Sequence, residues 1–122
     1  MQLTVAPGRT VPAMARTFVR GCADVLGATP NADAILLTSE VVTNAVQHAD
    51  TRAVVILVER VGSALHVAVV DDDPSPPVLQ PDDPGQAGGF GVRLVDQLAA
   101  SWGVDDLVED GKRVWFEIEL PG

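Results

Sequence analysis

The chain has 122 residues, of which 47% are hydrophobic and 20% are charged, so it can bury a core and is too apolar to be disordered. Eight Lys and Arg against 17 Asp and Glu give a formal net charge of -9, which argues against a nucleic-acid surface because that binding needs basic residues. A single cysteine excludes an intrachain disulfide, and neither a signal peptide nor a membrane-spanning apolar run is recognisable. We therefore expect one compact domain over residues 1–122, in the cytoplasm.

A short strand over residues 2–6, closed by a Pro-Gly turn, precedes a predicted helix over residues 10–26. The helix prediction rests on apolar residues that recur at three- and four-residue spacing. Thr10 is placed to cap the N-terminus of this helix, and Gly27 is placed to end it. Cys22 lies on the apolar face, where we expect it to act as a small buried hydrophobe.

The second predicted helix runs from residue 31 or 33 to about residue 50 and carries a polar strip. At about 100° per residue, Glu40, Asn44 and His48 fall on one narrow strip beside an apolar arc. A carboxylate can accept a proton or orient a nucleophile, and a carboxamide oxygen can ligate a hard cation such as Mg²⁺. The alternative is that these residues are ordinary solvated helix surface.

Two runs rich in β-branched residues, 53–61 and 64–71, predict a hairpin around a Gly-Ser turn. His66 alternates with apolar neighbours in the second run, so we expect it on the sheet surface and assign it no role. The following stretch, 72–89, is dense in Pro, Gly and Asp and predicts no regular element. A loop of this length in so small a domain is typical of a functional lid.

The last quarter of the chain predicts a third helix over residues 89–103 and then a hairpin over residues 102–120. The helix begins with GGFG, which would offer backbone amides and the positive end of the helix dipole to phosphates. The alternative is that these glycines serve only as hinges of the loop. Because helices and strands do not alternate strictly, the element order predicts an α+β fold with a mostly antiparallel sheet covered on one face.

Three motifs of the chain together resemble the GHKL superfamily of histidine kinase-like ATPases. EVVTNAVQH around Glu40 and Asn44, the strand end at Asp71, and GFG at residues 89–91 are similar to its N, G1 and G2 boxes. The short single domain and the runs SEVVTNAVQHA, GFGVRLVDQL and GKRVWFEIEL are most similar to bacterial anti-sigma-factor serine/threonine kinases and actinobacterial regulatory ATP-binding proteins. The resemblance covers nearly the whole chain and implies the two-layer Bergerat fold.

The resemblance also implies ATP and Mg²⁺ as cofactors and gives the site residues their roles. Glu40 would be the catalytic base that activates the attacking hydroxyl, and Asn44 would be the Mg²⁺ ligand. Asp71 would accept a hydrogen bond from the adenine amino group. The remaining implied ATP-binding residues are His48, Gly89, Gly91 and Val92.

The partners implied by the resemblance are a STAS-type anti-sigma antagonist, whose serine would be phosphorylated, and a sigma factor; a homodimer is left open. The chain departs from the family pattern at the G1 box, which usually reads D-x-G-x-G but here has Asp73 and Ser75 in place of the glycines. Arg113 stands where relatives commonly place Thr or Ser. These departures keep open a partner-binding module that has weakened or lost ATP binding, and an ATPase without a protein acceptor is a further alternative.

Overall fold

The computed structural model describes residues 1–28, 32–48, 52–73, 97–107 and 111–120, without the side chains of Gln47 and His48. The described elements are β1 (Gln2–Val5), α1 (Val11–Val25), α2 (Ala32–His48), β2 (Val54–Val61), β3 (Ala64–Asp71), β4 (Ser101–Asp106) and β5 (Lys112–Glu119).

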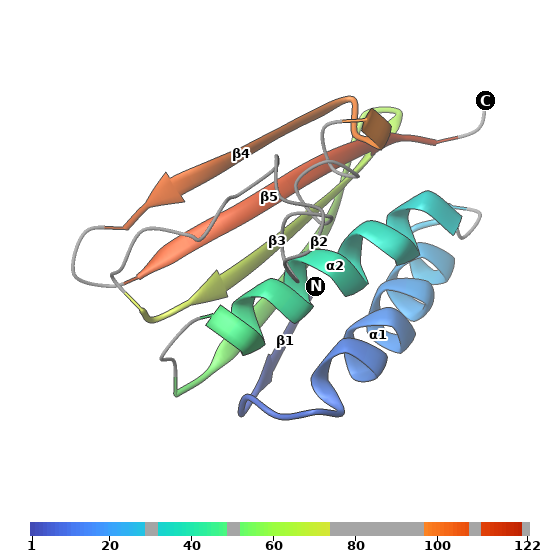
Figure 1. Cartoon of the computed structure of the whole chain (residues 1–122). Helices are drawn as coiled ribbons and strands as arrows, with labels where there is room; N and C mark the ends of the chain where they lie inside the picture. The colour runs from blue at the N-terminus through green and yellow to red at the C-terminus, as the bar shows by residue number, and fades with distance from the viewer. Residues whose placement is uncertain (29–31, 49–51, 74–96, 108–110, 121–122) are drawn as a thin grey trace.

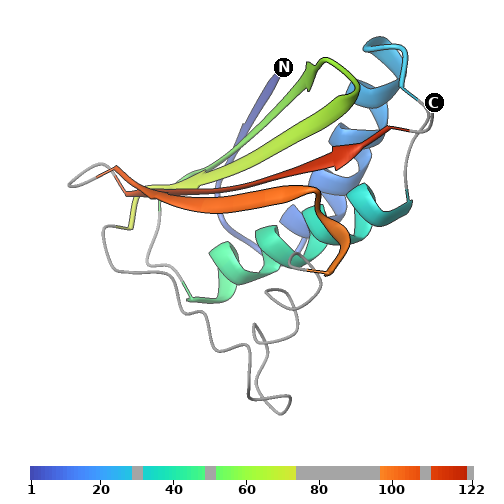
Figure 2. The same cartoon turned by 90° about the horizontal axis from the view of Figure 1, so that it is seen from above.

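The five strands form one antiparallel sheet in the order β1-β2-β3-β5-β4 (Figure 1). Both described helices lie against the same face of this sheet, as the view from above shows (Figure 2). The arrangement confirms the predicted α+β fold with helices on one face. No helix in the described ranges has the length and apolarity needed to cross a membrane.

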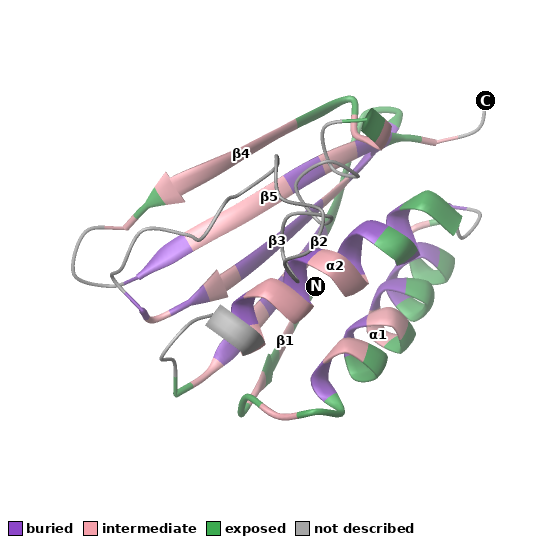
Figure 3. Ribbon diagram, viewed as in Figure 1, coloured by how far each residue is buried: buried purple, intermediate pink, exposed green. Residues whose placement is uncertain are grey.

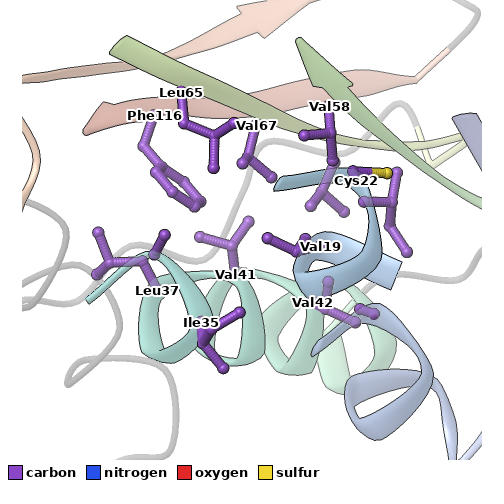
Figure 4. Close-up of a cluster of buried hydrophobic side chains, with 14 of the residues drawn as sticks. Val19, Cys22, Ile35, Leu37, Val41, Val42, Val58, Leu65, Val67 and Phe116 are labelled. Carbon is purple, nitrogen blue, oxygen red and sulfur yellow. The ribbon is translucent and has the colours of Figure 1, made fainter. Parts of the chain in front are cut away.

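The core lies between the two helices and the sheet face that they cover (Figure 4). Alternate residues of β2 and β3 point into it because successive side chains of a strand face opposite sides. From α1 the core takes the apolar face that includes Cys22, which is 4% exposed, as predicted. The largest side chains buried in the core include Phe116, Leu37, Ile56, Leu65, Val11, Val19, Val42, Val54, Val58, Val67 and Val69.

The start of α1 differs from the sequence prediction. Thr10 has helical backbone angles, with φ -85° and ψ -10°, and its side chain makes no capping hydrogen bond. A capping side chain requires extended backbone at that residue, so Thr10 cannot fulfil the predicted role. Instead the Val11 amide donates to the Gly8 carbonyl at 3.2 Å, and the Thr10 hydroxyl donates to Sδ of Met14 at 3.7 Å.

The third predicted helix is corrected at its C-terminal end. Gln97 and Leu98 are helical, but the chain is extended from Ser101 onward, so residues 101–103 belong to β4 and not to a helix. Strand pairing explains the difference: Gly103 lies opposite Trp115 of β5, whose indole covers it. The rest of the predicted helix, residues 89–96, lies outside the described residues.

Candidate functional site

Three strand ends and the end of α2 come together at one end of the fold. Val54, the first residue of β2, pairs with Asp71, the last residue of β3, and Asp71 also pairs with Lys112, the first residue of β5. The last residue of α2, His48, precedes β2 by only five residues, so α2 ends close by. Figure 3 shows the buried ends of β3 and β5 side by side at this end.

A buried ion pair occupies the junction of β3 and β5. Lys112 Nζ donates to Asp71 Oδ1 at 3.1 Å, and the Asp73 amide donates to the same oxygen at 3.0 Å. Lys112 also donates to the Asp73 carbonyl at 3.3 Å. Asp71 is 2% exposed, Asp73 6% and Lys112 8%. The ammonium group therefore offsets the cost of burying the Asp71 carboxylate.

Gly111 allows the two strands to approach this closely. Its φ is +108°, which L side chains rarely adopt, and a Cβ at this position would lie 2.7 Å from Cα of Asp72. The same Cβ would overlap the carbonyl oxygen of Asp71. A glycine immediately before Lys112 is therefore required for the ion pair to form as it does.

The two extra acidic residues of the altered G1 box, Asp72 and Asp73, both have polar partners. Asp72 Oδ1 accepts a hydrogen bond from the Arg52 amide at 2.9 Å, and Asp72 Oδ2 forms an ion pair with Nε of Arg52 at 3.5 Å. The Asp73 backbone contributes both of its polar groups to the Asp71–Lys112 cluster. Ser75 and residues 74–89 of the predicted lid lie outside the described residues.

Glu40 and Asn44 lie one turn apart on the flank of α2 that faces away from α1. Ser39 faces α1, because Arg16 Nη1 donates to its Oγ at 2.8 Å. Glu40 and Asn44 are rotated from Ser39 by about 100° and 140° around the helix. Both residues are half-buried, and within the described part of the chain neither side chain makes a hydrogen bond or an ion pair.

The unengaged carboxamide of Asn44 fits a magnesium ion carried by a nucleotide. No group of three or more His, Cys, Asp or Glu residues in the described ranges could hold a metal through protein ligands alone. Mg²⁺ usually keeps several waters and takes one or two protein oxygens together with substrate phosphates. One carboxamide oxygen at the rim of α2 is compatible with that mode, and Asn44 would hold the ion there.

Arg113 points away from the side of the sheet that carries Glu40 and Asn44. Lys112 and the buried Phe116 face the helices, so alternation puts Arg113 on the open face. There its guanidinium donates twice to Oδ2 of Asp105, with Nε at 3.0 Å and Nη2 at 2.6 Å. Arg113 therefore does not crowd the Asp71 cluster.

Four of the predicted site residues cannot be placed. Gly89, Gly91 and Val92, which were expected to bind the phosphates, lie outside the described part. The side chain of His48, the last residue of α2, is not described. The structure adds Lys112, which the sequence analysis missed. The only sequence signal for it was the Gly-Lys pair at the start of the last strand.

Comparison with known proteins gives one family and a set of similar structures. A family model described as the histidine kinase-like ATPase domain matches residues 5–118. The histidine kinase domain of the blue-light activated histidine kinase EL346 from Erythrobacter litoralis is 30% identical at a TM-score of 0.53, covering 72% of this chain and 43% of that one. A second structure of that kinase is 23% identical at a TM-score of 0.59, covering 95% of this chain and 42% of the other, and supports the fold alone. The chain thus spans less than half of either protein, and no protein with a curated description matches it.

Proposed function

Because the chain belongs to the histidine kinase-like ATPase family, we propose that it binds ATP with Mg²⁺ and transfers the γ-phosphoryl group to a serine or threonine of a protein. One observation carries this proposal. Glu40 and Asn44 are half-buried, one helical turn apart and unengaged within the described residues, so a carboxylate and a carboxamide face the same space. Both side chains are therefore available to a ligand bound beside α2, as the proposed reaction requires.

Glu40 acts as the base in the proposed reaction. Its carboxylate accepts the proton of the attacking hydroxyl, whose oxygen bonds to the γ-phosphorus as the bond from that phosphorus to the bridging oxygen breaks and ADP leaves. Asn44 would hold Mg²⁺, which would supply neutralisation of the phosphate charge. Asp71 would accept a hydrogen bond from the adenine amino group. Gly89, Gly91 and Val92 would contact the phosphates, and His48 would be a further ATP-binding residue.

The acceptor that we propose is a STAS-type anti-sigma antagonist, with a sigma factor as the second partner. Support for this choice comes from the amino-acid sequences of the motifs, above all SEVVTNAVQHA and GKRVWFEIEL. A histidine acceptor is the competing choice, since the similar structures are those of a histidine kinase. Phosphoserine survives acid whereas phosphohistidine does not, so acid treatment of the labelled partner separates the two.

A second function is favoured by the state of the G1 box. Asp71 is 2% exposed and already paired with Lys112, and the box lacks its usual glycines. The pairing of the buried Asp71 and the missing glycines are both compatible with a module that binds a partner protein and has lost nucleotide binding. Calorimetric titration with a non-hydrolysable ATP analogue, with and without Mg²⁺, decides between the two functions. We expect Mg²⁺-dependent binding in the micromolar range; no binding up to about 1 mM, near -4 kcal/mol, would select the partner-binding module.

Replacement of Glu40 by glutamine tests the catalytic role. We expect Glu40→Gln to keep the affinity for the ATP analogue and to lose about 100-fold or more of the phosphotransfer rate, because a base acts only in the transition state. Glu59→Gln is the matched control, since Glu59 is an exposed glutamate of β2. Equal transfer rates for Glu40→Gln and the parent protein would remove Glu40 from the mechanism.

A further inference from the structure

We propose that Lys112 is a positioning residue for recognition of the nucleobase: it fixes the Asp71 carboxylate so that one oxygen is left for the exocyclic amino group of adenine. This inference rests on the proposed function. It assigns Lys112 a role beyond stability, which it exerts through the Asp71 carboxylate and not by contact with the base. The competing explanation is that Lys112 only neutralises the buried charge of the Asp71 carboxylate.

The two oxygens of Asp71 are used unequally. Within the described residues, the hydrogen bonds to this side chain go to Oδ1, which accepts from Lys112 Nζ at 3.1 Å and from the Asp73 amide at 3.0 Å. A carboxylate is planar, so two donors on one oxygen also fix the direction of the other. Oδ2 is thereby presented as an acceptor with a set orientation.

The lysine is itself held in place from several sides. The Lys112 side chain donates to the Asp73 carbonyl at 3.3 Å as well as to Asp71. The Lys112 backbone lies directly opposite Asp71 in the β3–β5 pairing. Gly111 lets the backbone of β5 begin against the carbonyl of Asp71, where a Cβ would not fit. The ammonium group therefore has little freedom to leave the carboxylate.

An oriented acceptor distinguishes adenine from hypoxanthine. Adenine presents an amino donor at position 6, whereas hypoxanthine presents a carbonyl oxygen there, which would face the Asp71 carboxylate without a hydrogen bond. If Lys112 orients Asp71, loss of the lysine should remove this preference selectively. If Lys112 only stabilises the fold, its loss should weaken both nucleotides together.

The test measures the dissociation constants of Mg²⁺-ADP and Mg²⁺-IDP by calorimetry for the parent protein and for Lys112→Met. We expect the parent to prefer ADP by about tenfold or more, and Lys112→Met to lose most of that preference while its affinity for IDP changes by less than about threefold. Lys112→Arg should restore the preference because it returns the charge and the donor. Arg113→Met, on the same strand but on the open face, is the control and should behave as the parent.

Lys112→Gln is the second variant, because it keeps a donor for Oδ1 if Lys112→Met fails to fold. We expect it to retain part of the ADP preference. An unchanged ADP preference in a folded Lys112→Met or Lys112→Gln protein would overturn the positioning role and leave the proposed function standing. A parent protein that binds neither nucleotide would overturn both together.

Discussion

Buried polar side chains in the described part of the chain each have a hydrogen-bond partner. Thr38, which is fully buried, donates to the Ala34 carbonyl at 2.7 Å, one turn earlier in α2. Asp71 and Lys112 satisfy one another across two strands. No buried side-chain nitrogen or oxygen of the described residues lacks a partner. Substitutions that remove one member of such a pair should therefore cost more than the pair itself contributes.

The residues of the candidate site differ in how far their positions can be predicted from the sequence. Glu40 and Asn44 are found by helical periodicity, because four residues make one turn and the rule is local. Lys112 is separated from Asp71 by 41 residues. No local rule brings the start of one strand to the end of another, so this pairing becomes visible only when the register of β3 and β5 is known.

Cys22 gives a prediction about thiol reactivity. It is 4% exposed, and burial raises the pKa of its thiol, so both access and thiolate formation are limited in the folded protein. We expect its reaction with an aromatic disulfide reagent at pH 8 to be at least about 100-fold slower than in urea, since access requires a local opening of a few kcal/mol. Fast reaction of the native protein would contradict this burial.

A matched control and a pH effect follow from the same thiol. Val25→Cys places a second thiol on α1 at a position that is 73% exposed, and this thiol should react at once. Because burial raises the native pKa of Cys22, the resulting contribution to stability is present below the pKa of the thiol in the unfolded chain, and it is lost as the pH rises through the native pKa.

At the scale of elements, the hairpin of β4 and β5 shows where sequence patterns are ambiguous. The short run of apolar and small residues around Ser101 is compatible with the end of a helix and with a strand. The strand forms because these residues pair with β5. The helices α1 and α2 and the hairpin of β2 and β3 are long and strongly periodic, and the sequence predicts them within a few residues.

Gly103 tests the packing of this hairpin. A Cβ at this position would lie 2.8 Å from Cζ2 of Trp115, whose ring also stacks on His66 with centroids 5.4 Å apart. Gly103→Ala should therefore move the indole and destabilise the fold by about 1–3 kcal/mol, measured by urea unfolding and by tryptophan fluorescence. Gly21→Ala is the control: it lies in α1 with open space around it, and should stabilise by about 0.5–1 kcal/mol. Equal effects of the two substitutions would refute the contact.

At the scale of the whole molecule, fold class follows from the order of the elements, and a net charge of -9 follows from composition. Neither predicts which strand ends meet. The candidate site is built where α2, β2, β3 and β5 end or begin together, and that assembly depends on contacts between residues far apart in sequence.

The excess of acidic residues predicts a response to salt. Self-repulsion of a chain with a formal net charge of -9 weakens the folded state, and added ions screen it. We expect Tm to rise by a few degrees, about 0.5–1 kcal/mol, as sodium chloride increases from about 0.05 to 0.5 M. Calorimetric melting curves measure this change, and a fall in Tm would show that favourable ion pairs such as Arg113 with Asp105 outweigh the repulsion.

Both ends of the described chain are tied to the part of the sheet remote from Asp71. The Met1 ammonium donates to the Val58 carbonyl at 2.9 Å, and the Leu120 amide donates to the carbonyl of Ser63, in the turn between β2 and β3, at 2.8 Å. A fluorescent reporter or surface tether attached at either point would leave the opposite end open to solution. Immobilised protein would thus leave the end of the fold that carries Asp71 and Asn44 facing the solution, which makes sensor formats on a chip a natural way to measure its ligands.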